Sequence, residues 1–250
     1  IKECDWSSDV CSSDLGNWYG GTYPMVIWQS SGTFTDNGYF WGLGGYSASD
    51  SNVNNSYYKT SGTAASYSAG TSFPKTAATI GYASVGNTQI AAGGDNGNDT
   101  YYRSGTGAWT LGTAYPSGSY TPLMGGRNDF AASTRWYGSC GGFSNTDFYS
   151  TTNGTSWTTE TSTPTAGGTG VNLSGYNGHI FYYPSNSTST YRYSSGSWTS
   201  QTSFPIANHY GTRAGGVFTY NSNKYWGIIA GFIAAPTNAA TTNDWYAQIS

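Results

Sequence analysis

Residues 88–116 read TQIAAGGDNGNDTYYRSGTGAWTLGTAYP, and this stretch holds the pattern that decides the fold. A short apolar segment ends on Gly93-Gly94, a tyrosine-rich segment follows, and a glycine turn leads to a segment that contains Trp109. Short aromatic and β-branched runs separated by glycine turns predict consecutive antiparallel strands. Residues 75–85 are expected to supply the strand before them, so the unit contains four strands.

The same markers recur along the chain. An aromatic residue precedes a proline by six or seven positions in five pairs: Trp18–Pro24, Tyr67–Pro74, Trp109–Pro116, Trp157–Pro164 and Trp198–Pro205. A small or substituted pair follows each proline: Gly44-Gly45, Gly93-Gly94, Gly141-Gly142, Tyr182-Tyr183 in place of glycines, and Ala230-Gly231. A period of 41 to 50 residues in these markers predicts a repeat architecture.

The composition indicates an aromatic core and excludes several classes of protein. Only 8% of the 250 residues are charged, while 23 Tyr and 10 Trp provide the apolar area that other proteins take from aliphatic residues. No basic cluster exists for a nucleic-acid backbone, and no apolar run is long enough for membrane insertion. Partners of these two kinds are therefore not expected.

The first fifteen residues are treated separately. Residues 4–15 (CDWSSDVCSSDL) resemble the translation of a sequencing-adapter oligonucleotide and share no motif with the repeats. We expect residues 1–15 to be a non-native leader and residues 16–250 to be one domain. Without the leader, eight acidic and eight basic residues remain, and Cys140 is left as the single cysteine, so no disulfide framework is expected.

The glycine pair, the aromatic strand and the spacing from tryptophan to proline resemble kelch repeats, as in galactose-oxidase-like β-propellers. This resemblance, over residues 16–250, implies an all-β propeller of four-stranded antiparallel blades. The expected blades are 25–74, 75–116, 117–164, 165–205 and 206–250, with 17–24 as a closing outer strand. The aromatic spacings alternate as 49, 42, 48 and 41, which favours an even number of blades and hence a fragment of a larger ring that forms five blades here. Residues 150–157 (STTNGTSW) also resemble a degenerate sialidase Asp-box, with Thr152 in place of aspartate.

In such propellers the loops that lead into the first strands, and those between the second and third strands, form the face where ligands usually bind. Aromatic rings stack on sugar C–H faces, and amides and carboxylates bind hydroxyls. The candidate ligand-binding residues on this face are Trp28, Tyr46, Asp50, Asp95, Asn96, Tyr120, Arg127, Phe143, Asn145, His209, Tyr210 and Arg213.

No catalytic or metal site is predicted. A copper oxidase would draw on His179, His209 and Cys140, but the two histidines are expected at opposite faces and the cysteine before Gly141-Gly142 is explained by packing. A glycosidase needs two carboxylates at a fixed separation, yet Asp99, Asp147 and Asp244 fall at one equivalent strand start. A sialidase-like arginine cluster is broken because Arg135 is expected on another strand.

The sequence therefore predicts a non-catalytic, cofactor-free, extracellular or virion-associated module that recognises glycans or a protein surface. Two alternatives stay open. One is a secreted propeller enzyme that is truncated in this chain. The other is a phage structural or tail protein, because tandem units that end in GTSW or GSW resemble those of virion proteins from marine phages.

Overall fold

The computed structural model describes residues 27–28, 31–34, 39–47, 51, 53–60, 66–77, 80–94, 97–116, 122–125, 135–140, 145–167, 172–176, 178–184, 187–204, 209–210, 215–220, 223–233 and 239–249. These residues form strands and turns and contain no helix, so the all-β prediction is confirmed. The expected leader 1–15 and the expected closing strand 17–24 lie outside them. Among the described residues no helix is long and apolar enough to cross a membrane.

Five four-stranded antiparallel sheets and a two-stranded sheet are built from the described residues. The first sheet contains β2 (Ser31–Phe34), β3 (Phe40–Leu43), β5 (Ser56–Lys59) and β6 (Ser68–Ala69). The second contains β7 (Gly81–Val85), β8 (Thr88–Ala92), β9 (Thr100–Ser104) and β10 (Thr110–Leu111). The third contains β11 (Pro122–Gly125), β12 (Trp136–Cys140), β13 (Phe148–Thr151) and β14 (Thr158–Thr159).

The fourth sheet contains β15 (Asn172–Tyr176), β16 (His179–Tyr183), β17 (Tyr191–Ser194) and β18 (Ser197–Ser200). The fifth contains β19 (His209–Tyr210), β20 (Gly215–Tyr220), β21 (Asn223–Ile233) and β22 (Ala239–Gln248), all paired through β21. The two-stranded sheet joins β1 (Ile27–Trp28) to β4 (Tyr46–Ser47).

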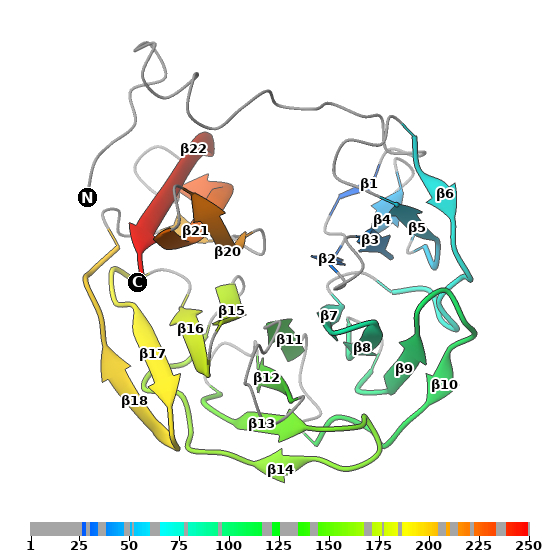
Figure 1. Cartoon of the computed structure of the whole chain (residues 1–250), viewed down its shortest axis with the longest axis horizontal. Helices are drawn as coiled ribbons and strands as arrows, with labels where there is room; N and C mark the ends of the chain where they lie inside the picture. The colour runs from blue at the N-terminus through cyan, green and yellow to red at the C-terminus, as the bar shows by residue number, and fades with distance from the viewer. Residues whose placement is uncertain are drawn as a thin grey trace.

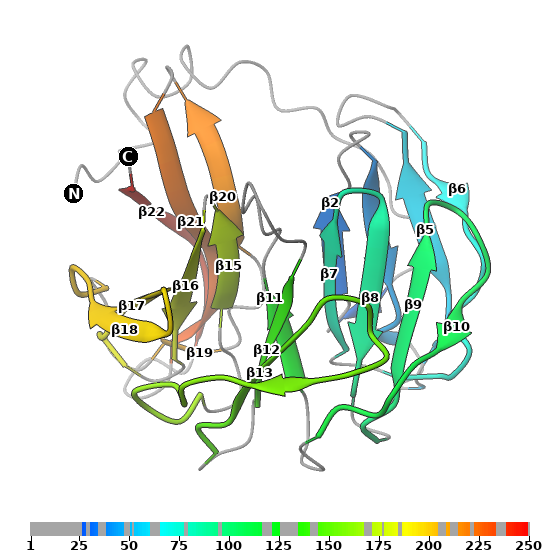
Figure 2. The same cartoon turned by 60° about the horizontal axis from the view of Figure 1, so that its bottom comes forward.

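The sheets follow one another along an arc in chain order (Figure 1). Their first strands lie innermost and contact one another in the sequence β2, β7, β11, β15 and β20. The short outer strands β6, β10, β14 and β18 lie on the perimeter (Figure 1), and Figure 2 shows the inner strands running side by side. Each sheet therefore meets the next face to face along a seam.

The glycine pairs are required by backbone conformation. Gly44 and Gly45 have φ of 61° and 114°, and Gly93 and Gly94 have φ of 70° and 96°. Side-chain-bearing residues rarely adopt this left-handed region. A Cβ on Gly44 would also lie 2.6 Å from the carbonyl oxygen of Ala77.

Two of the substituted pairs were assigned to the wrong place in the sequence analysis. Tyr182 is paired with Tyr191 inside β16, where Ala91 pairs with Tyr101 in the second sheet, so Tyr182 corresponds to Ala91 and not to a glycine of the pair. Ala230-Gly231 lies inside β21, at a register shift between Ile229 and Gly231. Proximity to the strand end misled the assignment, because only the pairing register identifies equivalent positions.

A repeated hydrogen-bond clasp joins the sheets. The indole Nε1 of Trp109 donates to the carbonyl oxygen of Thr71 (3.3 Å), that of Trp157 to Thr113 (3.0 Å) and that of Trp198 to Thr161 (2.9 Å). Each threonine lies three residues before a proline, just after the outer strand of the preceding sheet. Its hydroxyl donates in return to a carbonyl in the turn before the same tryptophan: Thr106, Thr155 and Gly196 respectively. The tryptophan-to-proline spacing thus encodes the contact between successive sheets.

In the first two seams the residue directly before the proline fills the space between the sheets. Phe73 packs edge-on against Trp109 at 5.3 Å, and Tyr115 against Trp157 at 4.9 Å. Tyr115 is fully buried and donates its hydroxyl to the carbonyl of Gly138 in the third sheet (2.8 Å). A Cβ on Gly138 would lie 2.8 Å from the Tyr115 ring, so glycine is needed there.

In the seam between the third and fourth sheets, the equivalent space is filled by a residue of the fourth sheet. Thr163 stands before Pro164 where Tyr115 stands before Pro116, and Tyr182 occupies the position equivalent to Gly138. The Tyr182 ring packs against Trp198 at 5.5 Å, and its hydroxyl donates back to the carbonyl of Thr165 (2.9 Å). The bulky ring therefore comes from the residue before the proline in one seam and from the facing strand in the next.

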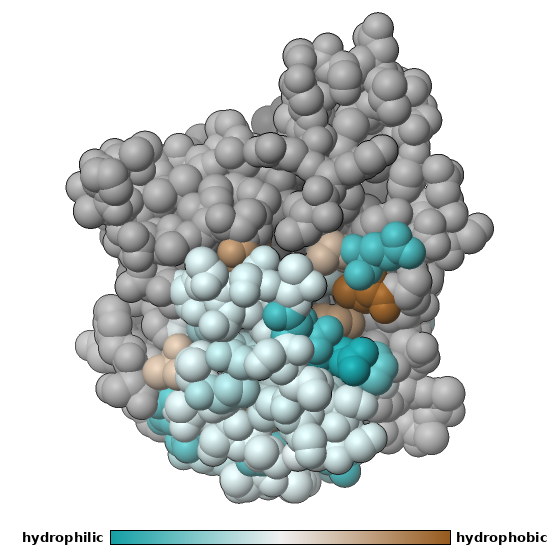
Figure 3. Space-filling view, turned by 90° about the vertical axis from the view of Figure 1, so that its left-hand side faces the viewer, coloured by the Kyte–Doolittle hydropathy of each residue, from teal (hydrophilic) through white to brown (hydrophobic). Residues whose placement is uncertain are grey.

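The outer surface is weakly polar. Figure 3 views the side that carries β17 and β18, where the described residues are mostly near-neutral or hydrophilic. Ser197, Thr199 and Ser200 of β18 are exposed there. The fully buried aromatic side chains, such as Tyr115 and Tyr182, lie in the seams between sheets.

The bulky ring comes from opposite sides of the second and third seams, which predicts strong energetic coupling between positions 115 and 138. Tyr115→Thr should lower the free energy of unfolding by about 3 kcal/mol because it empties a packed seam. Gly138→Tyr should also destabilise, because the new ring overlaps Tyr115. The double variant reproduces the Thr163–Tyr182 arrangement, and denaturant unfolding should show a cost at least about 1 kcal/mol below the sum of the two. Additive costs would contradict this coupling.

Candidate functional site

The structure brings two of the predicted site residues together. Trp28 in β1 and Tyr46 in β4 are direct cross-strand partners in the two-stranded sheet. Cross-strand partners in antiparallel sheets have neighbouring Cβ atoms on one face. Tyr46 follows the Gly44-Gly45 turn after β3, at the end of the first sheet where the sequence predicts a ligand surface.

The other predicted residues are placed only in part. His209 and Tyr210 form β19, opposite Ile233 and Phe232. Asn145 is half-buried and its Oδ1 accepts a hydrogen bond from the backbone N–H of Asp147 (2.7 Å), so it fixes the start of β13. The remaining predictions lie outside the described residues: Asp50, Asp95, Asn96, Tyr120, Arg127, Phe143 and Arg213.

A cleft that the sequence analysis missed opens at the seam between the second and third sheets. Its volume is about 520 Å³. It is lined by Val85, Thr88, Tyr102, Arg103, Ser104, Ala108, Thr110, Trp136, Thr152 and Asn153. None of these is an acid, and Arg103 is the only charged one. The lining thus combines aromatic rings, hydroxyl groups and one side-chain amide.

The seams differ in the side chain at one equivalent position. Arg103 of β9 reaches across to the first sheet, where its guanidinium lies 4.1 Å from the Trp41 ring centroid. Tyr193, at the equivalent position of β17, reaches back to Tyr137 of the third sheet at 5.9 Å. Thr151 holds that position in β13, and its short side chain bonds to its own turn instead.

Arg103 is a structural cation. It is 2% exposed, and its guanidinium lies between Trp41 and Trp109, at 4.1 Å and 4.2 Å from the ring centroids. It donates to Gln89 Oε1 (2.9 Å) and to the Thr71 carbonyl (3.3 Å). Burial lowers the pKa of Arg103 from its ordinary value, and the nearby Tyr82 hydroxyl opposes that shift. The Nε, Nη1 and Nη2 groups of Arg103 all donate hydrogen bonds within the protein. Arg103 therefore shapes the wall of the cleft, and its charge is not available to a ligand.

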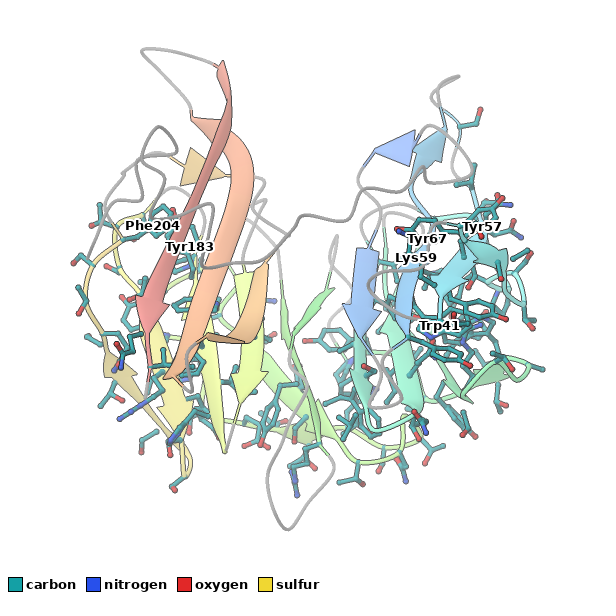
Figure 4. The ribbon with its side chains drawn as sticks, turned by 45° about the horizontal axis from the view of Figure 1, so that its top comes forward. Trp41, Tyr57, Lys59, Tyr67, Tyr183 and Phe204 are labelled. Carbon is teal, nitrogen blue, oxygen red and sulfur yellow. The ribbon has the colours of Figure 1, made fainter. Side chains whose placement is uncertain are left out.

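The first sheet repeats this arrangement with another cation. Lys59 is 6% exposed, and its ammonium lies 4.9 Å from the Tyr67 ring centroid (Figure 4). Tyr57 and Trp41 lie on the same sheet, whereas Tyr183 and Phe204 pack together at 4.4 Å on the far side of the arc (Figure 4). Cation–π contacts therefore support the faces of both the first and second sheets.

Glu160 is a half-buried acid that accepts hydrogen bonds from three side chains. Its Oε1 accepts from Ser150 Oγ (2.5 Å) and from Arg135 Nη1 (3.3 Å), and its Oε2 accepts from the Tyr193 hydroxyl (2.6 Å). These bonds link the third sheet to the fourth. A carboxylate held in this way is a cross-brace and is poorly suited to acid–base catalysis, because no oxygen faces an open site.

Metal chemistry finds no support in the described part of the chain, where no three His, Cys, Asp or Glu residues gather as ligands. His179 stands in the β15–β16 hairpin, opposite Tyr176. Burial lowers the pKa of the His179 imidazole, and the charge of Arg192 adds to this effect.

Buried phenols make stability sensitive to alkali. Burial raises the pKa of Tyr82 and Tyr183, and of Tyr193, where the hydrogen bond to Glu160 adds to the effect. Because the folded pKa exceeds the ordinary value of 10.0, the stabilisation is fully present below that pH and is lost as the pH rises above it. Denaturant unfolding between about pH 8 and 12 should show a falling free energy above about pH 10. A flat profile, or phenolate absorbance near pH 10 in the folded state for all tyrosines, would contradict this expectation.

Comparison of the chain with protein-family models finds no match, and comparison with curated proteins finds none.

Proposed function

We propose that this chain is a kelch-like β-propeller, extracellular or virion-associated, that acts as a non-catalytic module and recognises glycans or a protein surface. The arc of four-stranded sheets with first strands innermost supports the propeller. The engagement of Glu160 by three donors supports a binding role over an enzymatic one.

We expect the arc of sheets to close into a ring through one more tryptophan–threonine clasp, between the fourth and fifth sheets. Thr202 stands three residues before Pro205, as the clasp threonines stand before their prolines, and Phe204 next to that proline is buried. Residues 16–18 (GNW) match residues 196–198 (GSW), which carry the tryptophan of the fourth sheet. Residues 17–24 would form the outer strand next to β22, with Trp18 as the donor to Thr202.

Closure has a direct test with a matched control in the leader. Trp18→Ala should lower the free energy of unfolding by about 3 kcal/mol, because it removes a packed ring and a clasp donor. Trp6→Ala should leave stability unchanged, since Trp6 belongs to the expected leader. Thermal and denaturant unfolding measure both variants. Equal stability of the two would overturn closure by this strand.

The binding surface rests on one observation, the pairing of Trp28 with Tyr46. Two aromatic residues that are paired across strands would offer a platform on which the C–H face of a sugar stacks. Rigid aromatic groups lose little conformational entropy on binding, which suits them to recognition. The surrounding predicted residues would add amide, carboxylate and imidazole groups for hydroxyls.

An immobilised-glycan array tests this surface. The intact chain should bind a subset of glycans, and Trp28→Ala or Tyr46→Ala should weaken that binding by about tenfold or more. Leu111→Ala changes an exposed residue of β10 and serves as the matched control, with binding expected to be unchanged. Binding by both aromatic variants at full strength would exclude the surface, and binding of no glycan by a folded chain would leave the protein-surface form of the proposal.

A further inference from the structure

The cleft between the second and third sheets lies away from the Trp28–Tyr46 pair. Val85 and Thr88 line the cleft and flank the β7–β8 hairpin turn. Tyr46 instead follows β3, at the connection between the second and third strands of the first sheet. In an antiparallel sheet these two kinds of connection lie at opposite ends. The cleft is therefore a separate place on the molecule, and it does not depend on the surface proposed above.

We propose that this cleft is a second binding site and that its ligand is an uncharged pyranose. Its volume of about 520 Å³ falls within the range of about 300–1,000 Å³ that small-molecule sites occupy. The charges of the lining residues restrict which ligand the cleft can bind. Among the described residues that line the cleft there is no carboxylate, and the guanidinium of Arg103 is already engaged by Gln89 and Thr71. These residues favour an uncharged ligand.

The polar groups of the lining suit hydroxyls. Thr88, Ser104, Thr110 and Thr152 each offer a hydroxyl that both donates and accepts. Asn153 Oδ1 is occupied by the backbone N–H groups of Thr155 (2.9 Å) and Ser156 (3.3 Å). These bonds orient the side chain and leave its Nδ2 group as a donor at the exposed rim. Alternating donors and acceptors on a fixed frame are what a ring of hydroxyls requires.

The apolar groups of the lining suit the other face of a sugar. Tyr102 is half-buried against the Gly154 turn, where a Cβ on Gly154 would meet its ring at 3.1 Å, so the phenol ring is held in place. Trp136 is 2% exposed, and its Nε1 is buried without a hydrogen-bond partner. An unpaired buried N–H is costly. After a small shift of the indole, a ligand hydroxyl oxygen in the cleft would accept that bond.

The test uses the full chain and a panel of methyl pyranosides of glucose, galactose, mannose and N-acetylglucosamine. Saturation-transfer NMR and calorimetry should detect at least one of them with a Kd on the order of 1 mM. Ala108→Trp places a large ring in the cleft at an exposed position and should weaken that binding by at least about tenfold. Ser197→Trp is the matched control, because Ser197 precedes Trp198 as Ala108 precedes Trp109 and lies on the fourth sheet, so its binding should be unchanged.

A second variant separates ligand recognition from folding. Asn153→Asp keeps an oxygen for the two backbone N–H groups but removes the Nδ2 donor, so binding should weaken by about tenfold while the melting temperature is retained. Binding of no pyranoside at about 10 mM would overturn the proposal. Binding that survives Ala108→Trp but is lost in Trp28→Ala would also overturn it and would assign the sugar to the Trp28–Tyr46 surface.

Discussion

The hydrogen bond from an outer tryptophan to a threonine carbonyl of the preceding sheet is the constraint on which the described architecture depends. Each sheet is small, and its outer strand is as short as the two residues of β10 or β14. Such a strand cannot hold its sheet against a neighbour through backbone pairing alone. The indole of Trp157 and the hydroxyl of Thr113 make reciprocal bonds across the seam, and the ring before Pro116 packs against the same indole. One short segment therefore ends a sheet, sets its distance from the next and contributes to the core between them.

The clasp sets the distance between neighbouring sheets. Different combinations of side chains can therefore fill each seam. The first seam contains Arg103 between two tryptophans, and the third contains Tyr193 bonded to Glu160. In the second seam, Tyr115 supplies the bulk opposite Gly138, whereas Tyr182 supplies it opposite Thr163 in the third. The bulky ring thus comes from the residue before the proline in one seam and from the facing strand in the next. Thr151 holds the position of Arg103 and Tyr193, and the cleft lies beside the turn that follows it, at Thr152 and Asn153.

The sequence predicts the strands well because their signals are local. Glycine pairs with positive φ, glycine turns and tyrosine-rich runs each determine a few neighbouring residues, and β8 and β9 lie where the sequence places them. The misplaced equivalence of Tyr182 has a different origin, because register is set by pairing across strands and leaves no trace in linear spacing. The cleft was missed for a related reason. Its lining comes from strands and turns of two sheets, and linear spacing does not show which of these segments meet. The clasp itself was visible as a spacing, but the atoms that make it were not.

A repeated scaffold of this kind separates stability from recognition. The clasp residues recur with the same geometry in each described seam, so a change at Trp109, Trp157 or Trp198 affects the spacing of the sheets and with it every contact nearby. Residues such as Thr151 face the seam without taking part in the clasp between sheets. The residues at the equivalent positions differ among the described seams: Arg103 lies between two tryptophans, whereas Tyr193 bonds to Glu160. A substitution at such a position lowers the free energy of unfolding only through the packing of that side chain. It nevertheless changes the shape and polarity of the seam. The seams, as much as the loops at the ends of the sheets, are therefore where a chain of this architecture can acquire a new ligand without giving up its fold.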